Sequence, residues 1–468
     1  MIFSSVDFFI FFAVVLIFLA VVKSNPVKKG FLLAASYFFY GYWDWRFILL
    51  MFAMSLANYF FGQRIEATEV QKQRRFWLVT SVVFNLAVLG VFKYFNFFID
   101  SANAVLAGFD IRFPYLNILL PIGISFITFE VMSYTIDIYR RENKSTKNFF
   151  DLALLVAFFP HLIAGPILKP KEFLPQLERA ILIRVPHLIL GSQIFLVGLV
   201  KKVLVADRLA LFIEPVFRTP AAYDSMTVWL AVFAYALQIY CDFSGYSDMA
   251  IGSAKMMGFD IPANFNFPYI SKNITEFWRR WHISLSSWLR DYLYISLGGN
   301  RKGEIRTYIN LMLVMLLGGL WHGASWNFVV WGGLHGVGLA IHRAFSGRIQ
   351  ERFKQGVSPI VTGISWLMTF AFVCTAWVFF RSPDFGTSWT IVQKMYALTS
   401  TDGVNWIATA LFIALPIFFL ADWAAANLRS GKQFNMVGFR GLFVVIFVAM
   451  GVFFLAPENP APFIYFQF

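Results

Sequence analysis

Apolar runs separated by short polar loops recur along the whole of this 468-residue chain. Several approach the roughly 20 residues that an α-helix needs to cross the hydrocarbon core of a bilayer. Representative runs are Phe8–Val22, Trp77–Phe92, Val185–Val200, Met226–Tyr240 and Leu442–Leu455. Counting runs by length and apolarity predicts an all-α polytopic membrane protein with about 11 to 13 transmembrane or re-entrant helices.

Composition strengthens this prediction. Hydrophobic residues make up 59% of the chain and charged residues 14%, whereas a soluble domain is nearer to roughly a quarter charged. No polar linker is long enough to separate a soluble domain, so we expect residues 1–468 to form a single transmembrane domain. The first apolar run lacks the basic start and small-residue cleavage site of a signal peptide, which favours a retained helix.

The net charge of +13 favours a bilayer and its lipids over nucleic acid as the partner, because the basic residues lie in short loops between apolar runs. Lys and Arg accumulate in cytoplasmic loops, so we expect the basic loop after the first apolar run to lie in the cytoplasm. The N-terminus, at the other end of that run, is then expected to lie outside the cytoplasm. The basic clusters are Lys23/Lys28/Lys29, Arg64/Lys72/Arg74/Arg75, Arg140/Arg141/Lys144/Lys147 and Arg343/Arg348/Arg352/Lys354.

Two segments interrupt the regular pattern. Phe158–Pro170, which includes His161, is broken by three prolines, and Cys241–Pro268 carries several charged residues in an apolar setting. Irregular polar backbone at membrane depth is tolerated only where protein or a water-filled cavity surrounds it. We therefore predict re-entrant loops or half-helices lining a cavity, with Asp242 and Asp248 paired to nearby cations. Cys241 and Cys374 are expected to be small buried residues.

Residues 271–306 are dense in Trp, Arg and Tyr, which is typical of an amphipathic helix at the membrane interface. That interpretation does not explain His282 and Ser284 in the sequence WHISLS. The following GGNRKG loop is either a plain turn or a place where backbone amides and cations meet a phosphate.

His322 lies between two strongly apolar runs, where an ionisable side chain is costly unless it faces a cavity or a partner. Imidazole takes up and returns a proton near neutral pH, which suits general acid–base catalysis. A hydrogen-bonded core histidine in a glycine-rich helix crossing is the competing interpretation, and both stay open. His335 and His342 are seven positions apart without carboxylates, so we expect no metal site and a packing or hydrogen-bonding role for His335.

The blocks FWRRWHISLSSWLRDYLYISLGGNR and GGLWHGASWNFVVWGGLHG resemble the membrane-bound O-acyltransferase (MBOAT) family, specifically its bacterial alginate and peptidoglycan O-acetyltransferase branch. YCDFSGYSDMAIG, the start MIFSSVDF and the ending APFIYFQF are similar to the same branch. The resemblance thus extends over essentially the whole chain.

The resemblance implies an MBOAT fold, with tilted helices ringed around a central funnel and a catalytic core within residues 271–345. It places His322 at the central histidine of the family and His282 at the second polar position. It also implies a bacterial inner-membrane protein with no tightly bound cofactor, which uses cytoplasmic acetyl-CoA as co-substrate. A periplasmic or extracellular acceptor protein would be the partner, and a polysaccharide such as alginate the final acceptor.

These positions suggest chemical roles. A hydroxyl is a poor nucleophile until a base withdraws its proton, which we assign to His322. His282 would orient His322 or donate a hydrogen bond to the developing oxyanion. Ser284, Trp321 and Asn327 are weaker candidates that would shape the site.

Two alternatives remain at this stage. One is D-alanyl transfer from a carrier protein to teichoic acid, within the same family. The other is a transporter or flippase, against which the chain shows no matched pair of broken helices in two halves.

Overall fold

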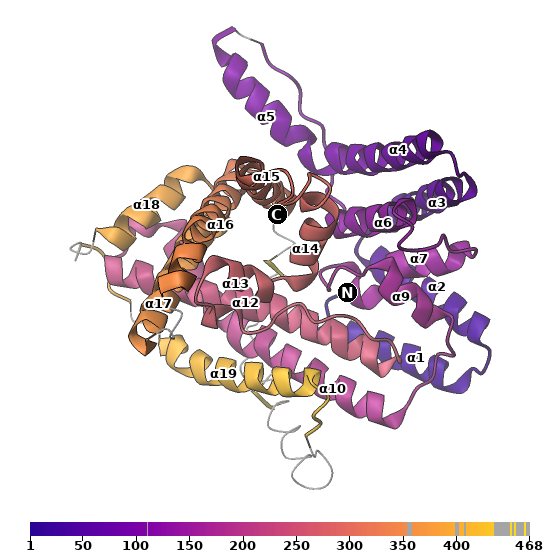
Figure 1. The fold of residues 1–468 in the computed structure, drawn as a ribbon. Coiled ribbons are helices and arrows are strands. Elements are labelled where there is room, and N and C mark those ends of the chain that lie inside the picture. The colour runs from indigo at the N-terminus through magenta and orange to yellow at the C-terminus, as the bar shows by residue number, and fades with distance from the viewer. Residues whose placement is uncertain are drawn as a thin grey trace. The chain divides into compact units, whose positions relative to one another are not determined.

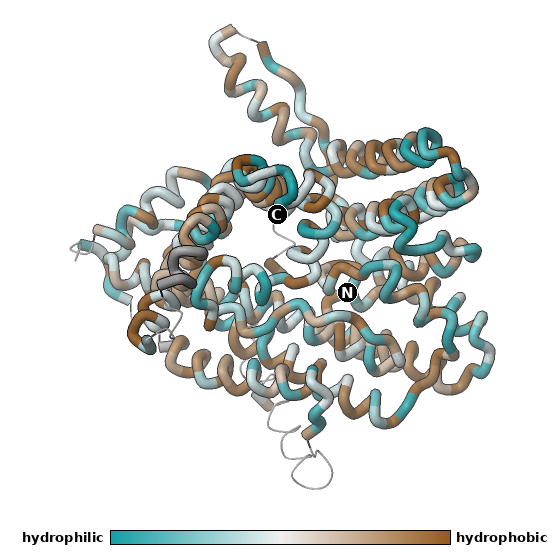
Figure 2. Tube along the Cα trace, in the orientation of Figure 1, coloured by the Kyte–Doolittle hydropathy of each residue, from teal (hydrophilic) through white to brown (hydrophobic). Residues whose placement is uncertain are grey.

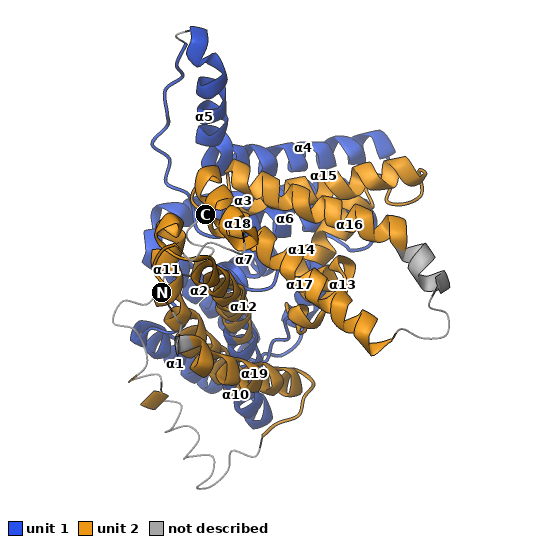
Figure 3. Cartoon of the chain, turned by 90° about the vertical axis from the view of Figure 1, so that its left-hand side faces the viewer, with its two compact units in different colours: residues 1–192, 249–262 blue, residues 193–248, 263–468 orange. Residues whose placement is uncertain are grey.

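The computed structural model describes residues 1–109, 111–352, 358–397, 402–406 and 409–434, with Met450, Gly451, Phe454, Phe463 and Ile464. Most of the predicted run Leu442–Leu455 and of the ending APFIYFQF lies outside these residues, as does Lys354. Two compact units divide the chain: residues 1–192 with 249–262, and residues 193–248 with 263–468 (Figure 3).

Unit 1 is built from the first nine helices, with α3, α4 and α6 packed against one another and α7 against α2 and α3. α6 is buried along almost its whole length. The helices are α1 (Val6–Val21), α2 (Asn25–Asp44), α3 (Arg46–Ala67), α4 (Gln71–Leu89), α5 (Phe95–Leu106), α6 (Ile124–Tyr139), α7 (Phe149–Ala157), α8 (Phe159–Leu162) and α9 (Pro170–Leu177).

Unit 2 contains both histidine-bearing sequence blocks. α10 begins in unit 1 and continues into unit 2 through the π-helix η3. The helices are α10 (Val185–Val200), η3 (Lys201–Ala206), α11 (Asp207–Arg218), α12 (Ser225–Met256), α13 (Ile274–Arg280), α14 (Ile283–Trp288), η6 (Leu289–Tyr294), α15 (Glu304–His322), α16 (Trp326–Arg352), α17 (Pro359–Arg381), α18 (Phe385–Tyr396) and α19 (Thr409–Arg429).

Helices long and apolar enough to cross a membrane occur in both units. Six stretches of the described chain meet this standard, among them α3, α12 and α17. Figure 2 shows hydrophobic residues along the helices and hydrophilic residues at the turn between α3 and α4. On α19, Phe412 and Leu420 are 73% and 67% exposed, which a bilayer accommodates and water does not. The predicted all-α polytopic membrane fold is confirmed.

α12 corrects one prediction. The passage from Cys241 onward was expected to be broken, yet α12 runs without interruption to Met256. The irregular backbone begins only at Met257. The helix tolerates Asp242 and Asp248 in its buried interior because each carboxylate pairs with a lysine. The proline-rich segment is interrupted as predicted, since the short α8 ends at Leu162 and the next helix, α9, begins at Pro170. Whether this segment lines a cavity stays a prediction.

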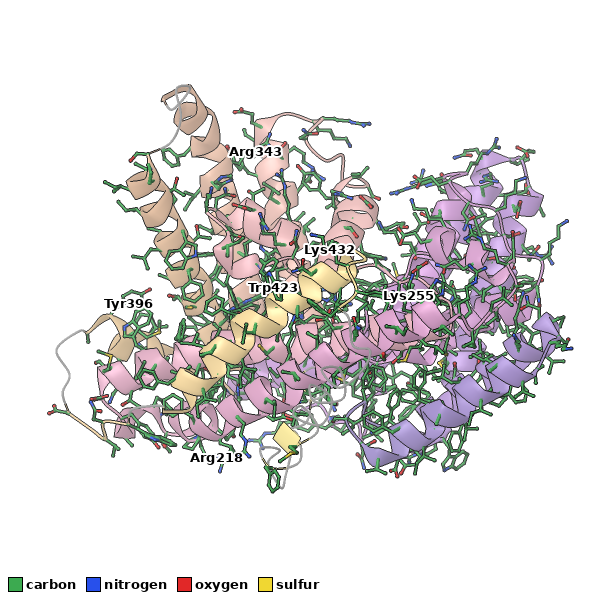
Figure 4. All side chains as sticks on the ribbon, turned by 90° about the horizontal axis from the view of Figure 1, so that it is seen from below. Arg218, Lys255, Arg343, Tyr396, Trp423 and Lys432 are labelled. Atoms are coloured by element: carbon green, nitrogen blue, oxygen red, sulfur yellow. The ribbon has the colours of Figure 1, made fainter. Side chains whose placement is uncertain are left out.

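Lys201 lies at the centre of a buried ion-pair network in unit 2. Its ammonium is 3.0 Å from both Asp248 on α12 and Asp422 on α19, and its side chain is fully buried. Arg429 donates to Asp248 at 2.6 Å, and the Tyr240 hydroxyl donates to Asp422 at 2.6 Å. Asp422 points inward, whereas the neighbouring Trp423, labelled on α19 in Figure 4, is 57% exposed.

A second cluster follows immediately along the chain. Lys202 lies 2.7 Å from both Asp207 and Asp242. The predicted pairing of Asp242 and Asp248 with cations is therefore confirmed, and the partners are two consecutive lysines of η3. A charge in an apolar interior is tolerated only when it is paired and hydrogen-bonded, so these pairs tie η3 to α12, and Lys201 ties both to α19.

Glycines bring the backbones of α15 and α16 into contact, and the two helices lie side by side in Figure 1. A Cβ atom at Gly319 would lie 2.2 Å from the carbonyl oxygen of Phe328, and one at Gly332 would lie 2.3 Å from that of Met315. Small residues permit this close approach in membrane helices. The pair therefore forms a rigid support for the histidine at the end of α15.

Substituting Gly319 tests this packing. We expect Gly319→Ala to lower the melting temperature of the detergent-solubilised protein, since overpacking costs about 1–3 kcal/mol. Gly333→Ala is the matched control, because its Cβ would meet the Leu316 side chain at an ordinary 3.7 Å. Equal melting temperatures for the two variants would contradict the close backbone approach.

Substituting Lys201 tests the ion-pair network. Lys201→Met removes the cation that Asp248 and Asp422 share and leaves Asp248 with Arg429. Breaking a buried pair costs about 3–5 kcal/mol. We expect a clear fall in melting temperature, whereas Lys272→Met, at an exposed position, should leave it unchanged. A Lys201→Met protein as stable as wild type would show that the network contributes nothing to folding.

Candidate active site

His322 is the last residue of α15 and is 4% exposed. Aromatic rings surround its imidazole. The ring centroids of Trp331 and Phe380 lie 5.0 and 5.2 Å away, and both rings stand nearly edge-on. Gly323 ends the helix in extended backbone, and a Cβ there would lie 2.1 Å from the Phe328 ring. The chain thus leaves α15 immediately beside the imidazole.

His282 occupies a break between two short helices. The interpretation of residues 271–306 as one amphipathic helix is wrong, because α13 ends at Arg280 and α14 begins at Ile283. His282 adopts a left-handed backbone conformation with φ of +42°, which is uncommon for a residue with a Cβ atom. It is fully buried. Such strain persists only where the surroundings hold it, and it is most frequent at functional sites.

The fold brings the two predicted histidines together. Their ring centroids are 6.4 Å apart although the residues are forty positions apart in sequence. Trp321 accompanies them, with its ring 5.0 Å from that of His322 and 6.0 Å from that of His282. Residues from α15 and from the α13–α14 break thus form one cluster.

Asn264 is the polar residue of this cluster that the sequence interpretation missed. It lies in the irregular segment after α12 and is 1% exposed. Its side-chain oxygen is 3.1 Å from His282 Nδ1 and accepts a hydrogen bond from the Ser284 hydroxyl at 2.9 Å. Ser284 therefore shares Asn264 as a partner with His282, and its site-shaping role stays a prediction. The available signal was a short amide side chain in a non-helical, apolar segment, where a buried polar group needs partners.

Other candidate residues lie apart from this pair or serve packing. Asn327 donates to the Ser382 carbonyl at 3.0 Å and the Ser388 hydroxyl at 3.2 Å, which joins α16 to α18, so its site-shaping role stays a prediction. Trp278 donates to His335 Nδ1 at 3.3 Å, the hydrogen-bonding role expected of that histidine. His161 belongs to unit 1, where its Nε2 is 2.9 Å from the Leu155 carbonyl oxygen.

The remaining sequence features fall into ordinary structural roles. The GGNRKG segment forms a turn, and Asn310 donates to its Gly299 carbonyl at 2.9 Å. Cys241 and Cys374 are both unbonded to other cysteines and buried, as predicted. Within the described residues no group of three or more His, Cys, Asp or Glu side chains has the arrangement of a metal site. The cluster at His282 and His322 consists of groups that accept, donate and move protons.

Comparison of the sequence with those of known proteins identifies the family of this chain. The model of the membrane-bound O-acyltransferase family matches residues 32–382, which include both histidines. A probable alginate O-acetylase AlgI of Pseudomonas aeruginosa is 46% identical over 85% of this chain and 75% of its own length. The corresponding protein of Pseudomonas putida is 40% identical over the full length of both chains.

A peptidoglycan O-acetyltransferase of Helicobacter pylori is 34% identical over 95% of this chain and 92% of its own. Proteins named teichoic acid D-alanyltransferase match at lower identity and over a smaller share of the chain. The family match covers well over half of the sequence, and the described residues contain six helices long and apolar enough to cross a membrane. The chain belongs to the membrane-bound O-acyltransferase family and is an O-acyltransferase.

Proposed function

We propose that this chain transfers an acetyl group from cytoplasmic acetyl-CoA for the O-acetylation of an extracytoplasmic polysaccharide such as alginate, directly or through a partner protein. The observation that carries the proposal is the buried His282–His322 pair within the region matched by the family model. Full-length similarity to proteins named alginate O-acetylase and peptidoglycan O-acetyltransferase supports acetyl as the group transferred.

The proposed reaction needs one proton shuttle. His322 takes the proton of the acceptor hydroxyl while the oxygen of that hydroxyl forms a bond to the thioester carbonyl carbon. The carbon–sulfur bond then breaks, and the proton held by His322 passes to the leaving thiolate, so the imidazole returns to its starting state. The aromatic residues around His322, namely Trp331 and Phe380, exclude water, which keeps the thioester from hydrolysis.

The names of the relatives support the proposed class of acceptor. Alginate and peptidoglycan are both extracytoplasmic polysaccharides that carry hydroxyl groups, and the proteins named for them match most of this chain. D-alanyl transfer to teichoic acid is less well supported, because the relatives named for it match a smaller part of the chain at lower identity. We therefore take a polysaccharide hydroxyl, or a partner protein that carries the acetyl group to it, as the acceptor.

The proposal includes a bacterial inner-membrane location with the N-terminus outside the cytoplasm. The supporting observation is the basic cluster Lys23/Lys28/Lys29, with Lys23 in the loop after α1 and Lys28 and Lys29 in the first two turns of α2. A reporter fused after Lys29 should read as cytoplasmic. A reporter signal from outside the cytoplasm would overturn the orientation.

The catalytic role of His322 is tested with purified protein, radiolabelled acetyl-CoA and alginate oligosaccharide, with and without the proteins encoded beside its gene. His322→Ala should lower the transfer rate at least about 100-fold, the scale of general acid–base catalysis. His187→Ala, which changes a half-buried histidine of unit 1, is the matched control and should retain full activity.

Transfer by His322→Ala as fast as by wild type would eliminate the proposed base. A deletion strain adds a separate test against transport. It should export polysaccharide normally and lack only the acetyl groups. Loss of export itself would favour the transporter interpretation.

A further inference from the structure

The side-chain oxygen of Asn264 faces three polar groups from one short segment, two of which donate to it. The backbone N–H of Ser284 is 3.2 Å from it, the Ser284 hydroxyl 2.9 Å, and Nδ1 of His282 3.1 Å. All of these groups are at least nine-tenths buried. An amide oxygen has two lone pairs and is often shared in this way, whereas an amide nitrogen has none to offer.

The Ser284 backbone settles which atom of the amide faces His282. Oxygen and nitrogen of an Asn side chain are distinguished by their hydrogen-bonding partners. A backbone N–H can only donate, so the Asn264 atom that meets it must be the oxygen. The other end of the amide agrees, because Nδ2 lies 3.4 Å from the Ser247 hydroxyl on α12, which has lone pairs to accept its hydrogen.

His282 therefore presents Nδ1 to an atom that only accepts. Two acceptors in contact without a hydrogen between them would repel, and inside a low-dielectric interior such a mismatch is costly. The proton of the neutral imidazole must then be on Nδ1, and the lone pair on Nε2. The partner of one ring nitrogen fixes the chemistry of the other.

We infer that Asn264 is a positioning residue that holds neutral His282 in its Nδ1–H form, so that Nε2 is a proton acceptor. The tautomer follows from geometry alone, while its use in acetyl transfer rests on the proposed function. Neutral His282 in this form accepts a hydrogen bond from the acceptor hydroxyl or from His322. It has no Nε2 hydrogen to donate, so it cannot stabilise the oxyanion by a hydrogen bond. Of the two roles expected from the sequence, orienting His322 remains, with Nε2 as the acceptor.

Asn264 also holds the backbone on which the ring is mounted. Its carbonyl oxygen accepts from the Ile283 N–H at 2.9 Å, directly after the left-handed residue His282. The Phe243 ring meets the imidazole edge-on with centroids 4.7 Å apart, which limits rotation of the ring. Asn264 thus fixes the position and the protonated nitrogen of His282, and Phe243 limits the orientation of its ring.

The titratable groups near His282 do not compete for its Nδ1 proton. His322 approaches from α15 at a centroid distance of 6.4 Å. On α12, Asp242 and Asp248 flank Phe243 in sequence, but Lys202 and Lys201 pair with them. α13 carries Glu276, which pairs with Arg280, and η6 carries Asp291, which pairs with Arg290. Asn264 contacts Nδ1 directly.

The tautomer can be read by ¹⁵N NMR of the detergent-solubilised full-length protein labelled in its six histidine rings, with His282→Gln to assign the signal. Wild type should show His282 with hydrogen on Nδ1. Asn264→Ala should lose that preference, because the acceptor is gone. Asn264→Asp should keep it, because a carboxylate oxygen still accepts. Asn266→Ala is the matched control, since Asn266 lies in the same segment with an exposed side chain.

Kinetics with acetyl-CoA as the probe supply the second reading. Asn264→Ala should lower kcat about 10- to 100-fold, the scale found for groups that orient a functional histidine, and leave KM for acetyl-CoA unchanged. Asn264→Asp should restore most of kcat. A general folding defect would not be rescued in this selective way, and the melting temperatures of the variants would reveal it.

The outcomes separate the inference from the proposed function. Wild-type His282 with hydrogen on Nε2 overturns the inference, as does an Nδ1–H form that persists in Asn264→Ala. A changed tautomer with unaltered kcat removes the role of Asn264 in the reaction. Wild-type protein that transfers nothing from acetyl-CoA counts against the proposed donor, while the NMR spectrum still decides the tautomer. Should Asn264→Ala fail to fold, the wild-type and Asn264→Asp spectra decide.

Discussion

Lys201 shows the constraint on which the rest of unit 2 depends: a charge inside a membrane-embedded helix bundle must be matched where it lies. Its ammonium forms ion pairs with both Asp248 and Asp422, and the adjacent Lys202 forms ion pairs with both Asp207 and Asp242. Because each cation serves two carboxylates on different elements, η3, α11, α12 and α19 have one relative arrangement that satisfies them all. Apolar packing alone permits sliding of one helix along another, whereas these pairs fix the register.

The same constraint explains the form of the candidate site. Among the residues that the structure describes, aromatic rings pack against both imidazoles, and an amide contacts His282. An amide orients a ring without placing a further charge in the interior. The close backbone contact of α15 with α16 at Gly319 then determines where His322 lies. Charge pairing sets the scaffold, and neutral hydrogen bonds and glycine contacts set the site.

Much of this could be predicted from the sequence, and the reasons differ by residue. The apolar runs predicted the helices because helix length and hydropathy are local properties. The pairing of Asp242 and Asp248 with cations followed from the cost of burying them. The break at His282 and the contact with Asn264 were missed, because a left-handed residue and an Asn eighteen positions earlier are joined only by the tertiary fold. The uninterrupted α12 was missed for a related reason, since its neutralising lysines come from η3. No local pattern revealed these partners.

The left-handed backbone at His282 has a consequence for how this position can change. A residue with a Cβ atom in that region is strained by about 1 kcal/mol or more, and glycine or asparagine would adopt the same φ with less strain. The imidazole at this position is fully buried and is held by Asn264 and by the Phe243 ring. A glycine here would relieve the backbone strain and lose those buried contacts at the same time. The strained backbone and the packed imidazole therefore exist only together, and a change at position 282 alters both.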